Sequence, residues 1–401
     1  MILTLWSSSA LAKCVLFAGA LTHLPEKEQI SDVLVGNDRI VSVGAGLPST
    51  WNGESCEKMD GKGLQLTAGF IEANSHLGLV EVSLEDRTSD FDAEKSDPVR
   101  ASLRVADAYN PASTLIPISR RGGVTSAITT PSGGLVSGQS GWVDLAGDTQ
   151  RASVIRPSIA VRAEFSAFGS RAESLLRLRE LLDDARRYSA KKAVWSDELL
   201  HPDGVSLGDL EALQPVLKRE VPLVIAANRA ADIEALLRLA EQQQIKLVIE
   251  GGAEAWMVAD LLAISKTAVI LDPYVYGPGG FDEVHGRAEN AALLEKAGVP
   301  VILSTFSSHN ARLLPQAAGN AVRGGMTHAG AIRAISSTPA EVFGVPDRGK
   351  IAVGSLANLV LWSGDPLELS TNVKGVWIGG QAMSLETRQT KLRDKYREIV
   401  K

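Results

Sequence analysis

The chain has 401 residues, 45% hydrophobic and 22% charged, which is enough for one large α/β domain and a smaller second one. Its formal net charge is -6, its pI is near 5.7, and no basic stripe is present, so we expect no nucleic acid among its partners. No apolar run is long enough to span a bilayer, so we also expect no membrane span.

The first twelve residues contain a short apolar run, three serines and then Ala10-Leu11-Ala12, a pattern similar to a signal-peptidase site. No basic residue precedes the run, and its apolar part is short. We interpret residues 1–12 as a clipped signal or leader segment, which leaves export to the periplasm and a cytoplasmic location equally open. Cys14 and Cys56 could form one bridge, but we expect two unpaired thiols.

Short β runs with alternating hydrophobicity occur at both ends of the chain. We predict that residues 13–66 and 349–385 together build one small composite β-sandwich, and that residues 386–401 form a C-terminal helix. The strands predicted for the sandwich are residues 15–17, 32–35, 39–43, 354–362 and 373–380.

Between these ends, short apolar runs alternate with helical periodicity. Strands that are apolar throughout are buried on both faces, which is typical of a parallel sheet covered by helices. Four successive βα units favour a TIM (β/α)8 barrel at residues 67–348, inserted in the composite β-sandwich, although a doubly wound fold is not excluded. The predicted pairs are residues 222–225 with 231–243, 246–249 with 254–264, 268–271 with 288–297, and 299–303 with a helix after 310; a strand at 123–128 and a helix at 172–190 precede them.

In a parallel barrel the reacting groups lie at the carboxyl ends of the strands, so the residues after each apolar run are the candidates for a site. We take His76 and His309 as candidate catalytic bases. Residues 133–141 are rich in glycine and are predicted to form a mobile loop over the site. The candidate substrate-binding residues are Asn74, Gln139, Asn228, Arg229, Glu250 and Asn310.

Residues 69–79, Gly-Phe-Ile-Glu-Ala-Asn-Ser-His-Leu-Gly-Leu, are similar to the metal-binding sequence Pro-Gly-Phe-Ile-Asp-X-His-X-His of the amidohydrolase superfamily. The stretches 122–125, 336–344 and 354–366 add to this likeness. The chain thus resembles the amidohydrolase superfamily and, within it, the imidazolonepropionase-like branch. The resemblance implies a composite β-sandwich with a metal-binding TIM barrel and hydrolysis of C–N or related bonds in small, often cyclic, substrates.

The same resemblance implies metal ligands at positions where this chain has mostly lost them. A lone histidine cannot hold zinc, which needs three or four ligands, so a zinc-type divalent metal is doubtful as a cofactor and His76 is its one inherited ligand. A relocated ligand set would have to use Glu72, His76, Glu250, Asp272 or His309. The positions of the family's ligands fall on Asn74, His76, Ala226, Asn228, Gly251 and Phe306.

Two functions therefore follow from the sequence. The first is a hydrolase of a carbon–nitrogen bond, other than a peptide bond, in a small and often cyclic substrate, with a degenerate metal site in which Asn74 and Asn228 position the substrate. The alternative is a catalytically inactive barrel that binds a small ligand or pairs, as a homo- or hetero-oligomer, with an intact relative. His76 would then only line the barrel mouth as a hydrogen-bonded polar residue.

Overall fold

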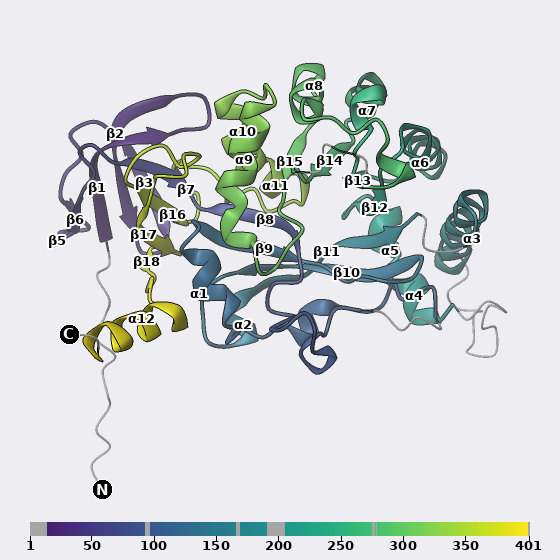
Figure 1. Ribbon diagram of the computed structural model, residues 1–401, viewed down its shortest axis with the longest axis horizontal. Helices are drawn as coiled ribbons and strands as arrows, with labels where there is room; N and C mark the ends of the chain where they lie inside the picture. The colour runs from purple at the N-terminus through teal and green to yellow at the C-terminus, as the bar shows by residue number, and fades with distance from the viewer. Residues whose placement is uncertain are drawn as a thin grey trace, which may run out of the picture.

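The computed structural model describes residues 14–92, 97–165, 169–190, 205–274, 277 and 279–399. Within these residues the strands form two eight-stranded sheets and one two-stranded sheet. In Figure 1 the first sheet lies at the left, and the strands of the second lie at the centre and right with helices along their outer side. The predicted leader, residues 1–12, is outside the described residues.

The first sheet combines strands from both chain ends, in the order β18-β17-β16-β7-β1-β2-β3, with β6 paired to β1. Strand β7 joins the two ends, because it pairs in parallel with β1 and antiparallel with β16. One face of the sheet buries Phe17, Leu66, Leu361 and Trp377. The strands are β1 (Cys14–His23), β2 (Glu28–Gly36), β3 (Arg39–Gly44), β6 (Glu57–Asp60), β7 (Gln65–Ala68), β16 (Leu359–Trp362), β17 (Val373–Ile378) and β18 (Gln381–Ala382); β4 (Thr50–Trp51) and β5 (Glu54–Ser55) form the small hairpin.

Cys14 and Cys56 form a disulfide, so the expectation of two unpaired thiols was wrong. The strand register explains the pairing. Strand β6 runs parallel to β1 with Val15 opposite Glu57, and this places the preceding residues, the two cysteines, next to each other. Both sulfurs are buried in a small apolar cluster that also contains Leu16 and Leu34.

The second sheet is a nearly closed barrel whose strands follow the order β15-β14-β13-β12-β11-β10-β9-β8. Every strand contributes at least one side chain to a single apolar cluster. In an eight-stranded barrel, inward-facing side chains of this kind fill the interior. The strands are β8 (Phe70–Ser75), β9 (Val124–Thr129), β10 (Val136–Asp144), β11 (Val154–Glu164), β12 (Leu223–Ala227), β13 (Leu247–Gly251), β14 (Ala268–Leu271) and β15 (Val301–Leu303). Their inner residues include Ile71, Ile128, Trp142, Ala160, Val224, Val248, Ile270 and Ile302.

The barrel and the sheet built by both chain ends confirm the predicted fold class. One strand departs from an all-parallel barrel, because β10 pairs antiparallel with both β9 and β11. Residues 133–141 were predicted to be a mobile loop, which is wrong: from Val136 onward they belong to the buried strand β10. Its glycines have a packing reason, since a Cβ on Gly138 would lie 2.6 Å from the Leu103 carbonyl oxygen and one on Gly141 would lie 3.0 Å from the Ala106 Cβ.

Helices cover the outer face of the barrel, and those predicted at 172–190 and 231–243 are present as α3 and α6. The helix predicted at 254–264 begins with a 3₁₀ turn, η4 (Ala255–Val258), before α7. No helix in the described ranges is long and apolar enough to cross a membrane. The helices are α1 (Leu115–Arg120), α2 (Gln150–Ser153), α3 (Arg171–Ala190), α4 (Leu207–Ala212), α5 (Gln214–Leu217), α6 (Ala230–Gln243), α7 (Ala259–Ser265), α8 (Asn290–Ala297), α9 (Leu314–Arg323), α10 (His328–Ala334), α11 (Ser337–Val342) and α12 (Arg388–Ile399).

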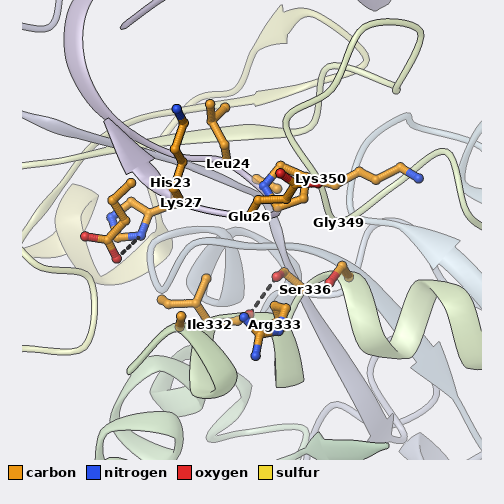
Figure 2. A pocket seen from close by; sticks show the side chains of 14 residues that line it. His23, Leu24, Glu26, Lys27, Ile332, Arg333, Ser336, Gly349 and Lys350 are labelled. Carbon is orange, nitrogen blue, oxygen red and sulfur yellow. Dashed lines mark hydrogen bonds and ion pairs between the residues drawn. The ribbon is translucent and has the colours of Figure 1, made fainter. Parts of the chain in front are cut away.

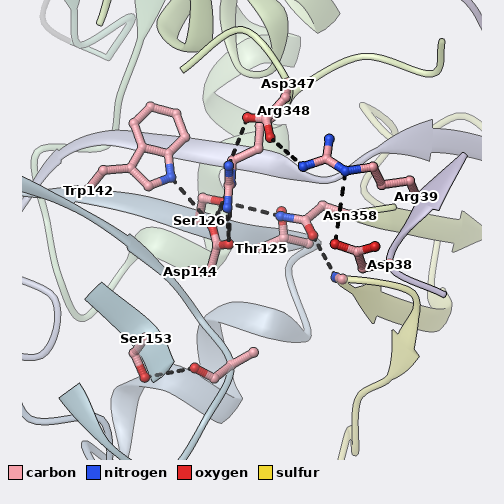
Figure 3. Close-up of polar contacts among 12 residues, drawn as sticks. Asp38, Arg39, Thr125, Ser126, Trp142, Asp144, Ser153, Asp347, Arg348 and Asn358 are labelled. Atoms are coloured by element: carbon pink, nitrogen blue, oxygen red, sulfur yellow. Dashed lines mark hydrogen bonds and ion pairs between the residues drawn. The ribbon is translucent and has the colours of Figure 1, made fainter. Parts of the chain in front are cut away.

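A buried ion pair joins the amino-terminal end of the barrel to the segment that returns to the first sheet. The Arg348 guanidinium donates from Nε and Nη2 to Asp144, the last residue of β10, at 2.8 to 3.2 Å (Figure 3). Ser126 and Trp142 also donate to this carboxylate. Because β10 is antiparallel, Asp144 lies at the end of the barrel opposite the carboxyl ends of the parallel strands.

Replacing both Cys14 and Cys56 with serine should lower the free energy of unfolding by about 3 to 4 kcal/mol, because the bridge closes a loop with a sequence separation of 42 and restricts the unfolded chain. Urea titrations of the oxidised wild type and the double variant measure the difference. Reductant should shift the wild-type curve and leave that of the variant unchanged. Two free thiols per chain in unreduced, denatured wild type would contradict the disulfide.

Candidate active site

A cavity of about 350 Å³ lies over the carboxyl ends of β11 to β15, a volume in the range of small-molecule sites. Its walls are both aromatic and acidic. The lining residues are Phe165, Ala226, Ala227, Asn228, Asp232, Glu250, Gly251, Ala253, Leu271, Asp272, Asp282, Glu283, Asn290 and Phe306.

Two other hollows are poorer candidates for chemistry. The one in Figure 2, between the β1–β2 turn with His23 and the end of α10 with Arg333, has a volume of only about 60 Å³. A larger groove of about 810 Å³ lies against α6 and α7, but it borders Leu247 and Ala268, the first residues of β13 and β14. It is therefore at the amino ends of these strands, away from the ends that carry reacting groups in a parallel barrel.

Arg162, near the end of β11, extends its guanidinium across the barrel mouth. Its Nε and Nη2 donate to the two oxygens of Glu250, on β13, at 2.8 and 2.7 Å. Its Nη1 donates to Glu164 at 2.5 Å and to the Pro131 carbonyl and Ser137 Oγ at 3.2 and 3.3 Å. The guanidinium thus contacts groups at the ends of four strands.

The guanidinium and Glu250 are nearly removed from solvent, with exposed fractions of 8% for Arg162 and 6% for Glu250. Burial disfavours the charged guanidinium, but the two carboxylates outweigh this effect, so the pKa of Arg162 is raised above its ordinary value. Arg162 therefore carries a fixed positive charge at every pH at which the protein is folded.

Asn74 and His76 lie together at the end of β8 and share Thr130 as a partner. The Asn74 Oδ1 accepts from Thr130 Oγ1 at 3.0 Å, while its buried Nδ2 has no acceptor among the described residues. The His76 Nδ1 lies 2.7 Å from the Thr130 carbonyl oxygen, which can only accept, so Nδ1 carries the proton and Nε2 the lone pair. The ring stacks on Phe91 with centroids 3.7 Å apart.

Burial lowers the pKa of His76, and the positive charge of Arg162 lowers it further, while the hydrogen bond to Thr130 opposes the shift. The imidazole is therefore neutral at neutral pH and its Nε2 can act as a base. His76 is not among the residues that line the 350 Å³ cavity.

Glu72 joins β8 to the chain after β15, where the described strands have no backbone ladder between them. Its carboxylate accepts from Ser304 Oγ, from the Thr305 amide at 3.2 Å and from Thr305 Oγ1 at 2.8 Å. The side chain is fully buried, and burial outweighs these hydrogen bonds and raises the pKa of Glu72 to about 7. The barrel is therefore closed at this seam by a side chain that titrates near neutrality.

Asp272, directly after β14, is the lining carboxylate with the fewest partners. Its Oδ1 accepts from the Tyr274 amide at 2.9 Å, and no hydrogen bond to Oδ2 is present among the described residues. Partial burial raises its pKa. The neighbouring acids are engaged: Asp232 and Asp282 both pair with Arg171.

The structure brings only some of the predicted site residues together. Asn228 and Glu250 line the cavity, but Asn228 also holds its wall, because its Nδ2 donates to Glu283 at 3.0 Å and its Oδ1 accepts from the Ala253 amide at 3.3 Å. Arg229 precedes α6 and is half-buried outside the cavity lining.

The other predicted residues lie apart from this cavity. Gln139 lies in β10 and donates to the Ala101 carbonyl at 3.0 Å. His309 follows β15, and both ring nitrogens have partners: Nε2 donates to the Glu81 carbonyl at 3.1 Å, and Nδ1 lies 3.4 Å from Ser83 Oγ. Asn310 is exposed beside it. The roles assigned to these residues stay predictions.

The residues present do not fit the divalent metal that the sequence resemblance implies. In the described part of the chain, no three His, Cys, Asp or Glu side chains gather closely enough to hold a metal ion. Ala226 and Gly251 offer no donor atom, and the ring of Phe306 packs on the inner apolar cluster where the family's aspartate would stand. The Arg162 cation already binds Glu250.

Sequence reasoning missed Arg162 and Glu164, and it named Asp272 only as a member of a relocated metal-ligand set. Arg162 and Glu164 belong to β11, which follows the antiparallel strand and was not predicted at all. A signal was available in Ile159-Ala160-Val161-Arg162-Ala163-Glu164, a β-type run that ends in two opposite charges two residues apart on one face.

Comparisons with known proteins agree with this architecture. The amidohydrolase family matches residues 224–383. The chain is 23% identical over 392 residues to the amidohydrolase tasK of Hapsidospora irregularis, covering 88% of this chain but only 40% of that protein. The crystal structure of an amidohydrolase from Thermotoga maritima MSB8 is 26% identical and superposes with a TM-score of 0.83 over 92% of this chain and 99% of that one.

These matches support a relationship between this chain and the amidohydrolase superfamily. An adenosine deaminase from Xanthomonas campestris with bound zinc shares the fold at 17% identity, with a TM-score of 0.56 over 96% of this chain and 97% of that one. The family match, the tasK relative and the Thermotoga maritima structure also support a hydrolase of the amidohydrolase type, whereas the adenosine deaminase likeness shows the fold alone. The imidazolonepropionase-like branch stays a prediction.

Replacing Glu72 with glutamine should remove a pH dependence of stability. The carboxyl group titrates at about 4.5 when unfolded and about 7 when folded, so the folded state holds the extra proton and wild-type stability falls as pH rises between these values. The difference corresponds to about 3 kcal/mol. Urea titrations from pH 4 to 8 should show the wild type losing stability relative to E72Q. Parallel curves would mean that Glu72 has the same pKa in the folded and unfolded states, which would contradict the raised pKa.

Proposed function

We propose that the chain is a hydrolase that cleaves a carbon–nitrogen bond, other than a peptide bond, in a small substrate such as a cyclic amide, without a bound divalent metal. The observation that carries this proposal is the cavity over β11 to β15, in which Asp272 has a carboxylate oxygen without a hydrogen-bond partner among the described residues. The amidohydrolase matches support the reaction class.

Asp272 is the proposed general base. The carboxylate takes a proton from water while the water oxygen bonds to the carbonyl carbon of the substrate. The C–N bond then breaks, and the proton passes from Asp272 to the leaving nitrogen. Partial burial raises the pKa of Asp272, which makes its carboxylate a stronger base than an exposed one.

Asn74 and His76 have subsidiary roles in this proposal. The Asn74 Nδ2 is a buried donor without an acceptor among the described residues, but Asn74 does not line the cavity, so it would contact only a substrate that extends beyond the lining residues. The His76 Nε2 has a free lone pair and is the alternative base. Without a Lewis acid several kcal/mol of transition-state stabilisation are missing, so the enzyme should be slow or restricted to activated substrates such as strained lactams.

A panel of lactams, imidazolones and cyclic ureas, assayed with chelator present, tests the proposal. We expect slow turnover that D272N lowers by at least ~100-fold, as for loss of a general base. D282N is the matched control, because Asp282 lines the same cavity but is paired with Arg171, and it should keep most of the activity. The pKa read from the acid limb of the pH profile should be higher than that of an ordinary aspartate.

The same panel distinguishes the other possibilities. Loss of turnover in H76A, with D272N still active, would move the base to His76. Complete inertness of the wild type across the panel would contradict the hydrolase proposal. If panel members then raise the melting temperature without being consumed, the second candidate, an inactive ligand-binding barrel, is favoured, and Phe306 in place of an acidic residue is the observation that supports it.

A further inference from the structure

Arg162 occupies the place in the barrel at which strand ends converge. Its guanidinium contacts the carbonyl of Pro131 after β9, Ser137 at the start of β10, Glu164 at the end of β11 and Glu250 on β13. One cation therefore meets groups from four strands of the barrel.

We infer that the Arg162 guanidinium takes the place of a metal cation at the barrel mouth and makes the folded protein independent of divalent metal. Glu250 directs both of its oxygens at the guanidinium in a bidentate pair. Glu164 accepts from Nη1 and is also held by the Gly133 amide at 3.2 Å. The two carboxylates thus share one cation that is part of the chain.

The charges explain why a cation is required here. A buried carboxylate that loses its only counter-charge is strongly destabilising, because its desolvation is no longer offset. Glu250 is 6% exposed and Arg162 is the side chain that neutralises it. Without the guanidinium, the carboxylates of Glu164 and Glu250 would face one site with no counter-charge, and a divalent cation that keeps water in its remaining positions would neutralise both.

The ion pair at the opposite end of the barrel provides a matched control. Arg348 binds Asp144 with the same paired geometry and comparable burial. Its second acid, Asp347, is also held by Arg39 (Figure 3), so removing Arg348 leaves only Asp144, of the two acids, without a counter-charge. Removing Arg348 should therefore destabilise the protein without creating a site for a metal.

The experiment compares the wild type, R162M, R162K and R348M after dialysis against chelator, by elemental analysis and by melting temperature with and without added zinc or manganese. We expect the wild type and R162K to hold far less than one equivalent of metal and to melt at the same temperature with or without it. R162M should melt several degrees lower, and zinc or manganese should restore at least half of that loss. R348M should melt lower too, with no recovery.

Three results would overturn the inference: close to one tightly held ion in the wild type, an equal rise in melting temperature of the wild type and R162M with metal, or no greater recovery in R162M than in R348M. If R162M does not fold alone, the same comparison is made by refolding, where metal in the buffer should recover R162M and not R348M. Failure of metal to do so counts against the inference. No readout depends on turnover, so failure of the proposed hydrolase activity is a separate result.

Discussion

The barrel mouth is organised by the bidentate ion pair between Arg162 and Glu250. Two buried, opposite charges on strands β11 and β13 satisfy each other, and Glu164 is a second carboxylate on the same cation. Such a pair contributes little net stability compared with an apolar core, but losing one member is costly because the other charge stays buried. Substitutions at the mouth are therefore constrained by this pair, and side chains that would compete for either carboxylate are excluded.

The residues at the positions where the sequence resemblance implies metal ligands fit the space around that pair. Ala226 and Gly251 leave space, and the cavity over β11 to β15 extends into it. A Cβ at Gly251 would lie 2.4 Å from Asn228 Oδ1, so a larger residue there would collide with the wall of the cavity. Phe306 adopts a left-handed backbone conformation, with φ of 50°, and its ring both covers the barrel interior and lines the cavity. The cavity is a partly apolar pocket beside a fixed cation.

Much of the fold could be predicted because hydrophobic periodicity reports burial directly. Strand β14 was predicted with its observed bounds, and α3 and α6 to within a residue. Strand β10 was not predicted because its glycines and serines are typical of loops. The glycines are needed because Leu103 and Ala106 pack closely against this strand, and a local sequence pattern cannot show such a contact. The disulfide was not predicted for a similar reason: the cysteines are brought together by the parallel pairing of β1 and β6, which the local sequence does not show.

The site was less predictable than the fold. The rule that chemistry lies at strand ends pointed to Asn228, Glu250 and Asp272, which all line the cavity, while their roles stay predictions. It could not show that His309 has partners for both ring nitrogens, nor that Glu250 is bound to an arginine from an unpredicted strand. Those facts depend on contacts between residues up to 228 positions apart in the chain.

The most direct measurement is an anomalous difference map from a crystal of the wild-type protein grown with zinc and recorded at the zinc absorption edge. The account predicts no peak within coordination distance of His76, Glu164 or Glu250, and continuous density for Arg162 between the two carboxylates. A strong peak bound by these side chains, with the guanidinium displaced, would contradict it.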